Sequence, residues 1–262
     1  DHNNIDAIIG LPANIFFGTG IPTIIMVLRK NKKDSDVLII DASKGFEKDG
    51  KNNKLRACDI KRIVDAYKER PEKIEKFARR VSRAEIVQND YNLNIPRYVD
   101  SSEKAESWDI YASMFGGIPE AELQDLSAYW TAFPHLKAAL FSPDNEAYCH
   151  LNVQNLKNAV LNHPDVVAFK TAFQNTFGDF DAYLKAALIE GMMELNAAGE
   201  EERLSREIFA RLAGIPLVDR YAAYQLLDDD WKKIAIDLEI IQTEGFAATK
   251  QVDPNMVLKK DA

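Results

Sequence analysis

The feature that most constrains the fold is a change of hydrophobic period along the chain. Before about residue 45, short apolar runs rich in Ile and Val are separated by polar, Gly and Pro residues, which is typical of strands. Beyond Pro119, apolar residues recur mostly at helical spacing, with Pro and Gly where helices would end. Strands do not alternate with helices, so no complete doubly wound sheet is predicted. We expect an α+β chain, mostly α, in which a small β hairpin or edge-strand segment precedes a multi-helix domain.

Three strands are predicted in the first part of the chain, at about residues 5–11, 22–28 and 36–42. The short polar turn before Asp36 favours an antiparallel hairpin between the last two strands. From Asp59 the pattern becomes helical, and Pro71 separates this first helix from a second, which apolar spacing places at about 72–83. An extended connector follows. This organisation predicts last strands of a core, then basic helices with the connector, then a helical domain, with the bounds 1–58, 59–100 and 101–262.

Length, charge and cysteine content limit the class of protein. The chain has 262 residues and no apolar run near the roughly 20 residues of a membrane helix, so no membrane partner is expected. Two cysteines exclude a disulfide scaffold and suit a cytoplasmic location. The net charge of −8 argues against nucleic acid. However, residues 1–100 hold 19 Lys and Arg against 15 Asp and Glu, a net charge of +4, whereas residues 101–262 have a net charge of −12.

Few motifs point to chemistry. Phe16–Gly20 has the letters F-x-G-x-G of a methyl-donor loop, but Pro22 and a β-branched run follow it instead of a helix N-terminus, so a turn between strands is favoured. The four histidines lack metal-ligand spacing, and no hydrolase or nucleotide motif occurs, so no metal site and no catalytic residue are predicted. The acidic run 228–230 is expected at a helix start, where it would favour the helix dipole.

The basic section between residues 44 and 83 is more suggestive. It contains 14 Lys and Arg against 7 Asp and Glu. Lys and Arg on a loop suit phosphate contacts, because they displace counterions regardless of base sequence. A solvated charged surface is the alternative interpretation. The candidate DNA-backbone residues are Lys44, Lys48, Lys51, Asn52, Lys54, Arg56, Arg79, Arg80 and Arg83.

Four sequence motifs occur in order near the N-terminus: IIGLP at 8–12, NIFFGTGIPT at 14–23, VLIIDAS at 37–43 and NKLR at 53–56. Together they resemble the modification (M) subunit of type I restriction–modification systems, an adenine-N6 DNA methyltransferase. Weaker similarity continues through residues 89–99 and 217–225 and includes Trp231. The resemblance implies that the first strands end a methyltransferase α/β core. It also implies DNA, a specificity subunit and a restriction subunit as partners.

The resemblance suggests a role for the aromatic turn. Such enzymes take the target base out of the DNA stack and hold it against an aromatic ring. Phe16 and Phe17, with Thr19, are the matching candidates for the target-base pocket. Their alternative role is core packing of the hairpin, since Phe is often buried.

Two family motifs are absent from this chain: the catalytic Asn-Pro-Pro-Tyr/Phe sequence and the donor-binding loop after the first core strand. The full-length family uses S-adenosylmethionine. We expect this chain to be a fragment that does not bind S-adenosylmethionine and is inactive alone. The sequence does not decide whether the chain is an enzyme. We expect it to contribute to adenine-N6 methylation through DNA backbone contacts and subunit assembly. The alternative is a protein–protein docking module of a DNA-processing complex that does not touch DNA.

Overall fold

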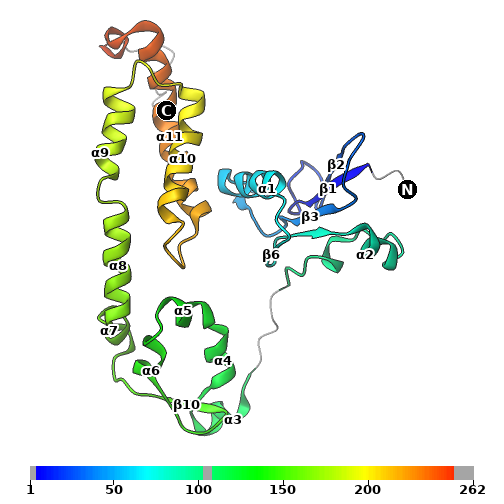
Figure 1. Cartoon of the computed structure of the whole chain (residues 1–262), viewed down its shortest axis with the longest axis vertical. Coiled ribbons are helices and arrows are strands. Elements are labelled where there is room, and N and C mark those ends of the chain that lie inside the picture. The colour runs from blue at the N-terminus through cyan, green and yellow to red at the C-terminus, as the bar shows by residue number, and fades with distance from the viewer. Residues whose placement is uncertain (1–3, 103–107, 251–262) are drawn as a thin grey trace, which may run out of the picture. The chain divides into compact units, whose positions relative to one another are not determined.

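The computed structural model describes residues 4–102 and 108–250. The chain consists of two compact units, Asp1–Ala105 and Glu106–Ala262. The first unit is built on a mixed sheet and the second is mostly helical (Figure 1). This confirms the expected order, a β-rich segment before helices, but the β segment is larger than a hairpin. Residues 59–100 lie in the same unit as residues 1–58.

The sheet of the first unit has five strands in the order β2-β1-β3-β7-β6. β1 pairs in parallel with β3, whereas the β1–β2, β3–β7 and β7–β6 pairs are antiparallel. A separate two-stranded ribbon contains β4 and β5. The strands are β1 Ile5–Gly10, β2 Ile24–Leu28, β3 Val37–Asp41, β4 Glu47–Asp49, β5 Asn52–Lys54, β6 Lys73–Ile74 and β7 Ala78–Val81.

The hydrophobic core lies on both faces of this sheet. One face, which includes Ile9 and Ile40, is covered by α1 (Ala57–Glu69) through Ile63. The other face, which includes Ile39, is covered by α2 (Arg83–Gln88) and the 3₁₀ turn η1 (Ile95–Arg97). All five residues of β3 are buried, as expected for a strand covered on both sides.

The predicted hairpin between the second and third strands is wrong. Both strands exist, but β1 lies between them, antiparallel to β2 and parallel to β3. The polar connection therefore crosses the end of β1. The side chain of Lys32 is buried and holds this connection against the sheet by donating to the carbonyls of Ile5 and Asp36. A turn sequence alone does not show which strand is the neighbour.

The second basic helix, predicted at about 72–83, is also wrong. This segment forms the β6–β7 hairpin, with Lys76 in the left-handed region at φ 57°. Ala78 and Val81 pair with β3 and are buried on opposite faces of the sheet. The four apolar residues of this segment have helical spacing, but hydrogen bonding to the free edge of β3 overrides that pattern.

The second unit contains a small β element that the sequence did not predict. Its three short strands have the order β8-β10-β9. Its secondary-structure elements are α3 Ile110–Phe115, β8 Ile118–Pro119, α4 Glu120–Asp125, α5 Ser127–Ala132, α6 Leu136–Leu140, β9 Phe141–Pro143, β10 Tyr148–Leu151, α7 Leu156–Leu161, α8 Pro164–Thr176, α9 Phe180–Lys185, η2 Ala186–Glu190, α10 Ala197–Leu212, α11 Arg220–Glu244 and η3 Phe246–Lys250.

The long helix α11 packs along α10 in Figure 1, with Trp231, Leu238 and Leu204 in their shared core. The expected helix start at residues 228–230 is wrong, because α11 runs through it without interruption. Asp228 is buried there and pairs with Lys232 one turn later. Within the described ranges, no helix is both long and apolar enough to cross a lipid bilayer.

Candidate nucleic-acid interface

The parallel pairing of β1 and β3 places two candidate loops at one edge of the sheet. The carboxyl ends of parallel strands meet at the same edge, and Gly10 pairs with Asp41 there. Residues 11–23 leave that edge from β1, and residues 42–56 leave it from β3. The carboxyl edge is where open α/β sheets commonly bind ligands. The aromatic candidates and five of the basic candidates therefore lie on loops from one edge.

The loop from β1, here called the aromatic loop (residues 11–23), has a defined shape. Its two ends are joined by a hydrogen bond from the amide of Leu11 to the carbonyl of Thr23, at 2.8 Å. A β-turn at its tip is closed by the amide of Thr19 and the carbonyl of Phe16, at 3.4 Å. Gly18, inside this turn, has φ 78°, which L side chains adopt only with strain.

The aromatic candidates are exposed, so the alternative that they pack in the hairpin core is wrong for this structure. Phe17 is 95% exposed and Phe16 is 55% exposed. Thr19 is half-buried, and its hydroxyl accepts a hydrogen bond from the amide of Ile21 at 3.3 Å. Thr19 therefore shapes the turn, while the two rings face outward.

The loop from β3 contains the β4–β5 ribbon, here called the basic ribbon (residues 47–54). Gly50, at φ 60°, allows its tight turn. Lys48, Lys51 and Lys54 are exposed. The Lys48 ammonium lies 5.6 Å from the Phe46 ring centroid, and Lys54 lies 4.0 Å from a carboxylate oxygen of Glu47. Exposed pairs of this length are weak, so these ammonium groups stay available to phosphates.

The aromatic loop and the basic ribbon are joined by Asn53. The side-chain amide of Asn53 is buried and donates to the carbonyl of Ala13 at 2.7 Å. The backbone amide of Asn53 donates to the carbonyl of Asn14 at 2.9 Å. Lys54 follows Asn53 directly, and Phe16 is two residues beyond Asn14. The structure thus brings together two groups of candidates that are about 35 residues apart in the chain.

Other candidates are placed differently. Asn52 is half-buried and pairs with Asp49 in the ribbon, whereas Lys44 is exposed. Arg56 is held at the start of α1, where its guanidinium donates to both carboxylate oxygens of Asp59 at 2.9 and 3.0 Å. These hydrogen bonds raise the pKa of Arg56 above its usual value. Arg56 is the N-cap residue of α1, and the Asp59 carboxylate closes this helix start by also accepting from the backbone amide of Arg56 at 3.0 Å.

The arginines of the β7 region are not joined to this edge. β7 runs antiparallel to β3, so Arg83, after the end of β7, lies at the opposite edge. Arg79 donates to both carboxylate oxygens of Glu85 at 2.9 Å, and Arg80 lies 3.7 Å from Asp36. Two of these three arginines are thus paired inside the unit.

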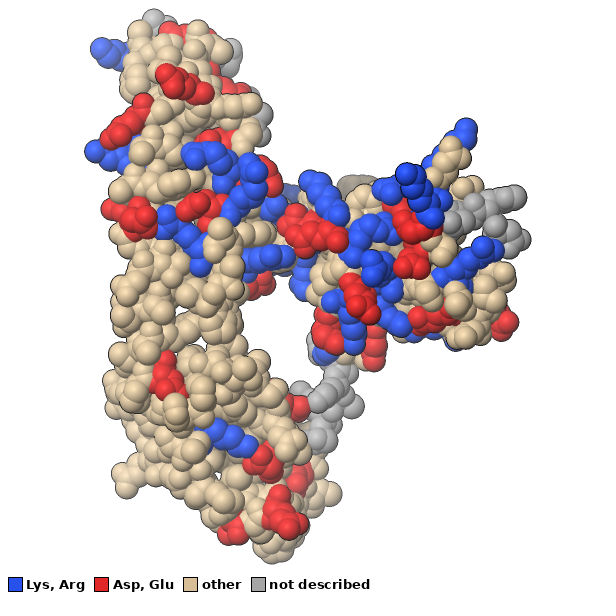
Figure 2. Space-filling view, in the orientation of Figure 1, with Lys and Arg blue, Asp and Glu red and all other residues tan. Residues whose placement is uncertain are grey.

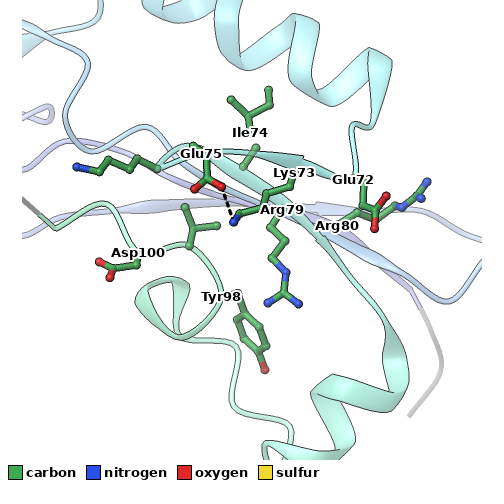
Figure 3. A pocket seen from close by; sticks show the side chains of 11 residues that line it. Glu72, Lys73, Ile74, Glu75, Arg79, Arg80, Tyr98 and Asp100 are labelled. Atoms are coloured by element: carbon green, nitrogen blue, oxygen red, sulfur yellow. Dashed lines mark ion pairs between the residues drawn. The ribbon is translucent and has the colours of Figure 1, made fainter. Parts of the chain in front are cut away.

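A cavity of about 680 Å³ lies beside the β6–β7 hairpin, close to Arg79. Figure 3 shows Lys73 directed toward Glu75, with which it forms an ion pair, and the Arg79 side chain extending away from the hairpin. The cavity is lined by both basic and acidic side chains, so it does not select for an anion. Figure 2 shows the same interleaving of Lys and Arg with Asp and Glu over the visible face of the first unit.

Asp41 is a polar residue at the carboxyl edge that the sequence analysis did not single out. It is buried at the end of β3, accepts from the amide of Ser43 at 3.0 Å and from the Ser101 hydroxyl at 2.5 Å. It lines a cavity of about 480 Å³ together with Lys44 and Arg62. An aspartate directly after four buried apolar residues is the signal that could have identified it.

The F-x-G-x-G letters of the sequence lie on a turn between two strands. The F-x-G-x-G letters fall on the exposed turn of the aromatic loop, which leads into β2 and lines neither cavity described above. This agrees with the interpretation of Phe16–Gly20 as a turn. In the described ranges, no cluster of three His, Cys, Asp or Glu side chains could hold a metal ion.

Comparison with known proteins gives the class. Residues 1–107 match the family described as N-6 DNA Methylase. The matched part of the chain is thus a member of this family, as the sequence motifs implied.

The relatives narrow the class to methylase subunits of type I restriction–modification systems. The chain is 40% identical over 111 residues to the type I restriction enzyme MpnII methylase subunit of Mycoplasma pneumoniae, covering 42% of this chain and 20% of that protein. It is 43% identical over 112 residues to the MjaVII methylase subunit of Methanocaldococcus jannaschii, covering 40% and 19%. The chain therefore matches about a fifth of the length of these relatives.

A solved structure is also similar in sequence over part of the chain. It is the crystal structure of the type I restriction–modification system methyltransferase subunit from Streptococcus thermophilus. Sequence identity is 53% with a TM-score of 0.38, and the match covers 38% of this chain and 21% of that one. The resemblance of residues 217–225 and Trp231 lies outside the matched family segment and stays a prediction.

Proposed function

We propose that this chain contributes to site-specific DNA adenine-N6 methylation as part of a type I modification subunit, and that the carboxyl edge of its sheet contacts DNA. The observation that carries the proposal is the Asn53 junction, which joins the loop with the exposed aromatic rings to the ribbon with the exposed ammonium groups. Ammonium groups neutralise phosphates, and aromatic rings stack on bases. The family of residues 1–107 supports DNA as the ligand.

The proposal separates the candidates by role. Lys48, Lys51 and Lys54 contact the DNA backbone, and the rings of the aromatic loop contact bases. Arg56 is held by Asp59 at the start of α1 and is not among the backbone contacts. The methyl donor binds elsewhere in the modification subunit, because the donor-binding and Asn-Pro-Pro-Tyr/Phe motifs of the family are absent from this sequence. A cytoplasmic location and assembly with specificity and restriction subunits belong to the same proposal.

The salt dependence of DNA binding tests the backbone contacts. Lys48→Ala, Lys51→Ala and Lys54→Ala in one chain should reduce the slope of log affinity against log salt by about 2 to 3, since each lost phosphate contact removes about 0.9. The matched control is Lys30→Ala, Lys33→Ala and Arg83→Ala, which removes the same charge at the opposite edge and should leave the slope unchanged. Equal slopes for both triple variants would contradict the proposal.

A second candidate function is protein docking by the helical unit. Exposed apolar side chains lie on α3 and just before its start, and they are here called the α3 patch. These side chains are between 53% and 82% exposed. Tyr148 contacts this surface: its ring lies tilted against the Tyr111 ring with the centroids 5.0 Å apart, and its hydroxyl donates to Asp109 at 3.1 Å. Exposed patches of this kind commonly mark protein interfaces. The α3 patch consists of Trp108, Ile110, Tyr111, Met114 and Phe115.

The two functions are distinguished by binding measurements with a purified specificity subunit. If the α3 patch docks that subunit, Trp108→Glu should weaken the complex at least tenfold and leave DNA affinity unchanged. Tyr129→Glu, at a half-exposed ring elsewhere in the same unit, is the control. Unchanged subunit affinity in Trp108→Glu would remove the α3 patch as the docking surface.

A further inference from the structure

Phe17 is the most exposed large apolar side chain of the first unit, at 95%. It is a central residue of the turn closed by Phe16 and Thr19, so the backbone directs it to the tip of the aromatic loop. Phe16, one residue earlier, is covered over nearly half of its surface. The two rings therefore have different environments, and Phe17 alone reaches solvent on all sides.

The loop that presents Phe17 is fixed in place. Its ends are joined by the Leu11–Thr23 hydrogen bond, its base is tied to Asn53, and Ile15 packs against the core beneath α1. A ring held this way does not have to be ordered when it binds, so little of its interaction energy is lost to conformational entropy.

The surroundings of Phe17 define the chemistry of its partner. Exposed ammonium groups of the basic ribbon lie on the segment joined to the same loop, so the partner combines negative charge with a surface for an aromatic ring. Duplex DNA has both, with phosphates outside and stacked bases inside. Proteins that open or kink DNA commonly insert an apolar side chain between bases.

We propose that Phe17 is a wedge that enters the base stack of duplex DNA and fills the gap left when a base swings out. The proposal rests on the proposed function, because it needs the basic ribbon to hold DNA against this edge. It adds a positioning role to that function: Phe17 stabilises the opened duplex, and Phe16, whose ring is covered over nearly half of its surface, remains the candidate that meets the extruded base.

A duplex with one abasic site tests the wedge, because such a site already contains the gap and needs no knowledge of the target sequence. The chain should bind this duplex at least about fivefold more tightly than the intact duplex, the lower end of what stacking on a single ring provides. Phe17→Ala should abolish this preference while keeping the salt slope of binding to intact DNA, which the ammonium groups of the basic ribbon set. Phe17→Trp should keep the preference, since a larger ring also fills the gap.

The control is Ile21→Ala, which removes a 71% exposed apolar side chain from the same loop and should keep the preference. Salt-dependent binding without any preference, or a preference that survives Phe17→Ala, would overturn the wedge and leave the proposed function standing. If Phe16→Ala lost the preference and Phe17→Ala kept it, the wedge would be Phe16, and the proposal for Phe17 would be wrong. Absence of salt-dependent binding to either duplex would overturn the proposed function and the wedge together.

Discussion

Asp6 joins three segments of the first unit at a point where no water reaches it. Its carboxylate is completely buried and accepts from the Tyr67 hydroxyl at 2.7 Å and from Arg70 at 3.2 Å, while Arg29 lies 3.4 Å away. Asp6 lies in β1, and Arg29 directly follows β2. Tyr67 and Arg70 lie at the C-terminal end of α1. A buried carboxylate is tolerated because each of its oxygens has a charged or hydrogen-bonding partner.

Asp6→Ala should therefore lower the free energy of unfolding by about 3 kcal/mol, because it leaves Arg70 partly buried without its counter-charge. Tyr67→Phe, which removes one hydrogen bond and keeps the ring, should lower it by about 1 kcal/mol. Urea denaturation followed by circular dichroism measures both. A smaller effect for Asp6→Ala than for Tyr67→Phe would contradict the view that charge pairing dominates this cluster.

Asn53 is the residue that joins the two halves of the candidate interface. Asn53→Ala removes the hydrogen bond to Ala13 and should lower the free energy of unfolding by about 1 kcal/mol. DNA affinity should fall as well, although no charge changes, because the basic ribbon is no longer held against the aromatic loop. Asn52→Ala, one residue away, is the control for both measurements. Normal DNA affinity in a folded Asn53→Ala protein would show that the junction is not needed.

At the scale of elements, local patterns predicted which segments are strands better than how they pair. The three N-terminal strands were predicted because each is a short β-branched run with turn residues beside it. Helix α8 fits the boundary pattern of the sequence, because Pro164 begins it and Gly178 follows it. Pairing was not predictable, since the position of β1 between β2 and β3 depends on contacts that local sequence does not contain.

The same limit applies to the candidate interface. Residue type and loop position predicted the aromatic and basic candidates, and the family match confirms the class of protein for residues 1–107. The junction was not predictable, because it depends on a buried amide, Asn53, that has no motif of its own. Pairing of Arg56 with Asp59 and of Arg79 with Glu85 likewise follows from the folded geometry, and a count of charges does not reveal it.

Strand β2 is an edge with an unusual surface. It pairs only with β1 among the described strands, and Ile24, Ile25, Met26 and Leu28 are each at least 46% exposed. Apolar residues on both faces are typical of a strand inside a sheet, and an exposed apolar edge invites a second strand. In a solution of this chain alone, the available second strand is β2 of another copy.

We therefore expect the isolated chain to self-associate in a concentration-dependent way. Met26→Lys should shift the sedimentation of the chain toward the monomer, because a charge on an edge strand opposes pairing. Met193→Lys, at a 59% exposed position of the helical unit, is the matched control and should not change it. A wild-type chain that stays monomeric at high concentration would show that the β2 edge is protected in some other way.

For the whole molecule, the net charge of −8 is a sum over two different units. The sheet unit contains the basic ribbon, and the helical unit contains most of the acidic excess, with the apolar α3 patch on its surface. This division fits a chain that meets DNA with one unit and protein with the other. Total charge is thus a poor guide to the partners of a two-unit chain, because each partner meets only the charges of one surface.

A last prediction concerns methyl transfer by the whole chain. The carboxyl edge supplies rings and cations, but the F-x-G-x-G letters form an exposed turn and no Pro-Pro pair occurs in the sequence. Incubated with labelled S-adenosylmethionine and unmodified duplex DNA, the chain should transfer no label above background while still binding the DNA in a salt-dependent way. A complete type I methylase subunit with its specificity subunit is the positive control. Label transfer by this chain alone would show that its residues form a donor site after all, and would refute the division of roles proposed above.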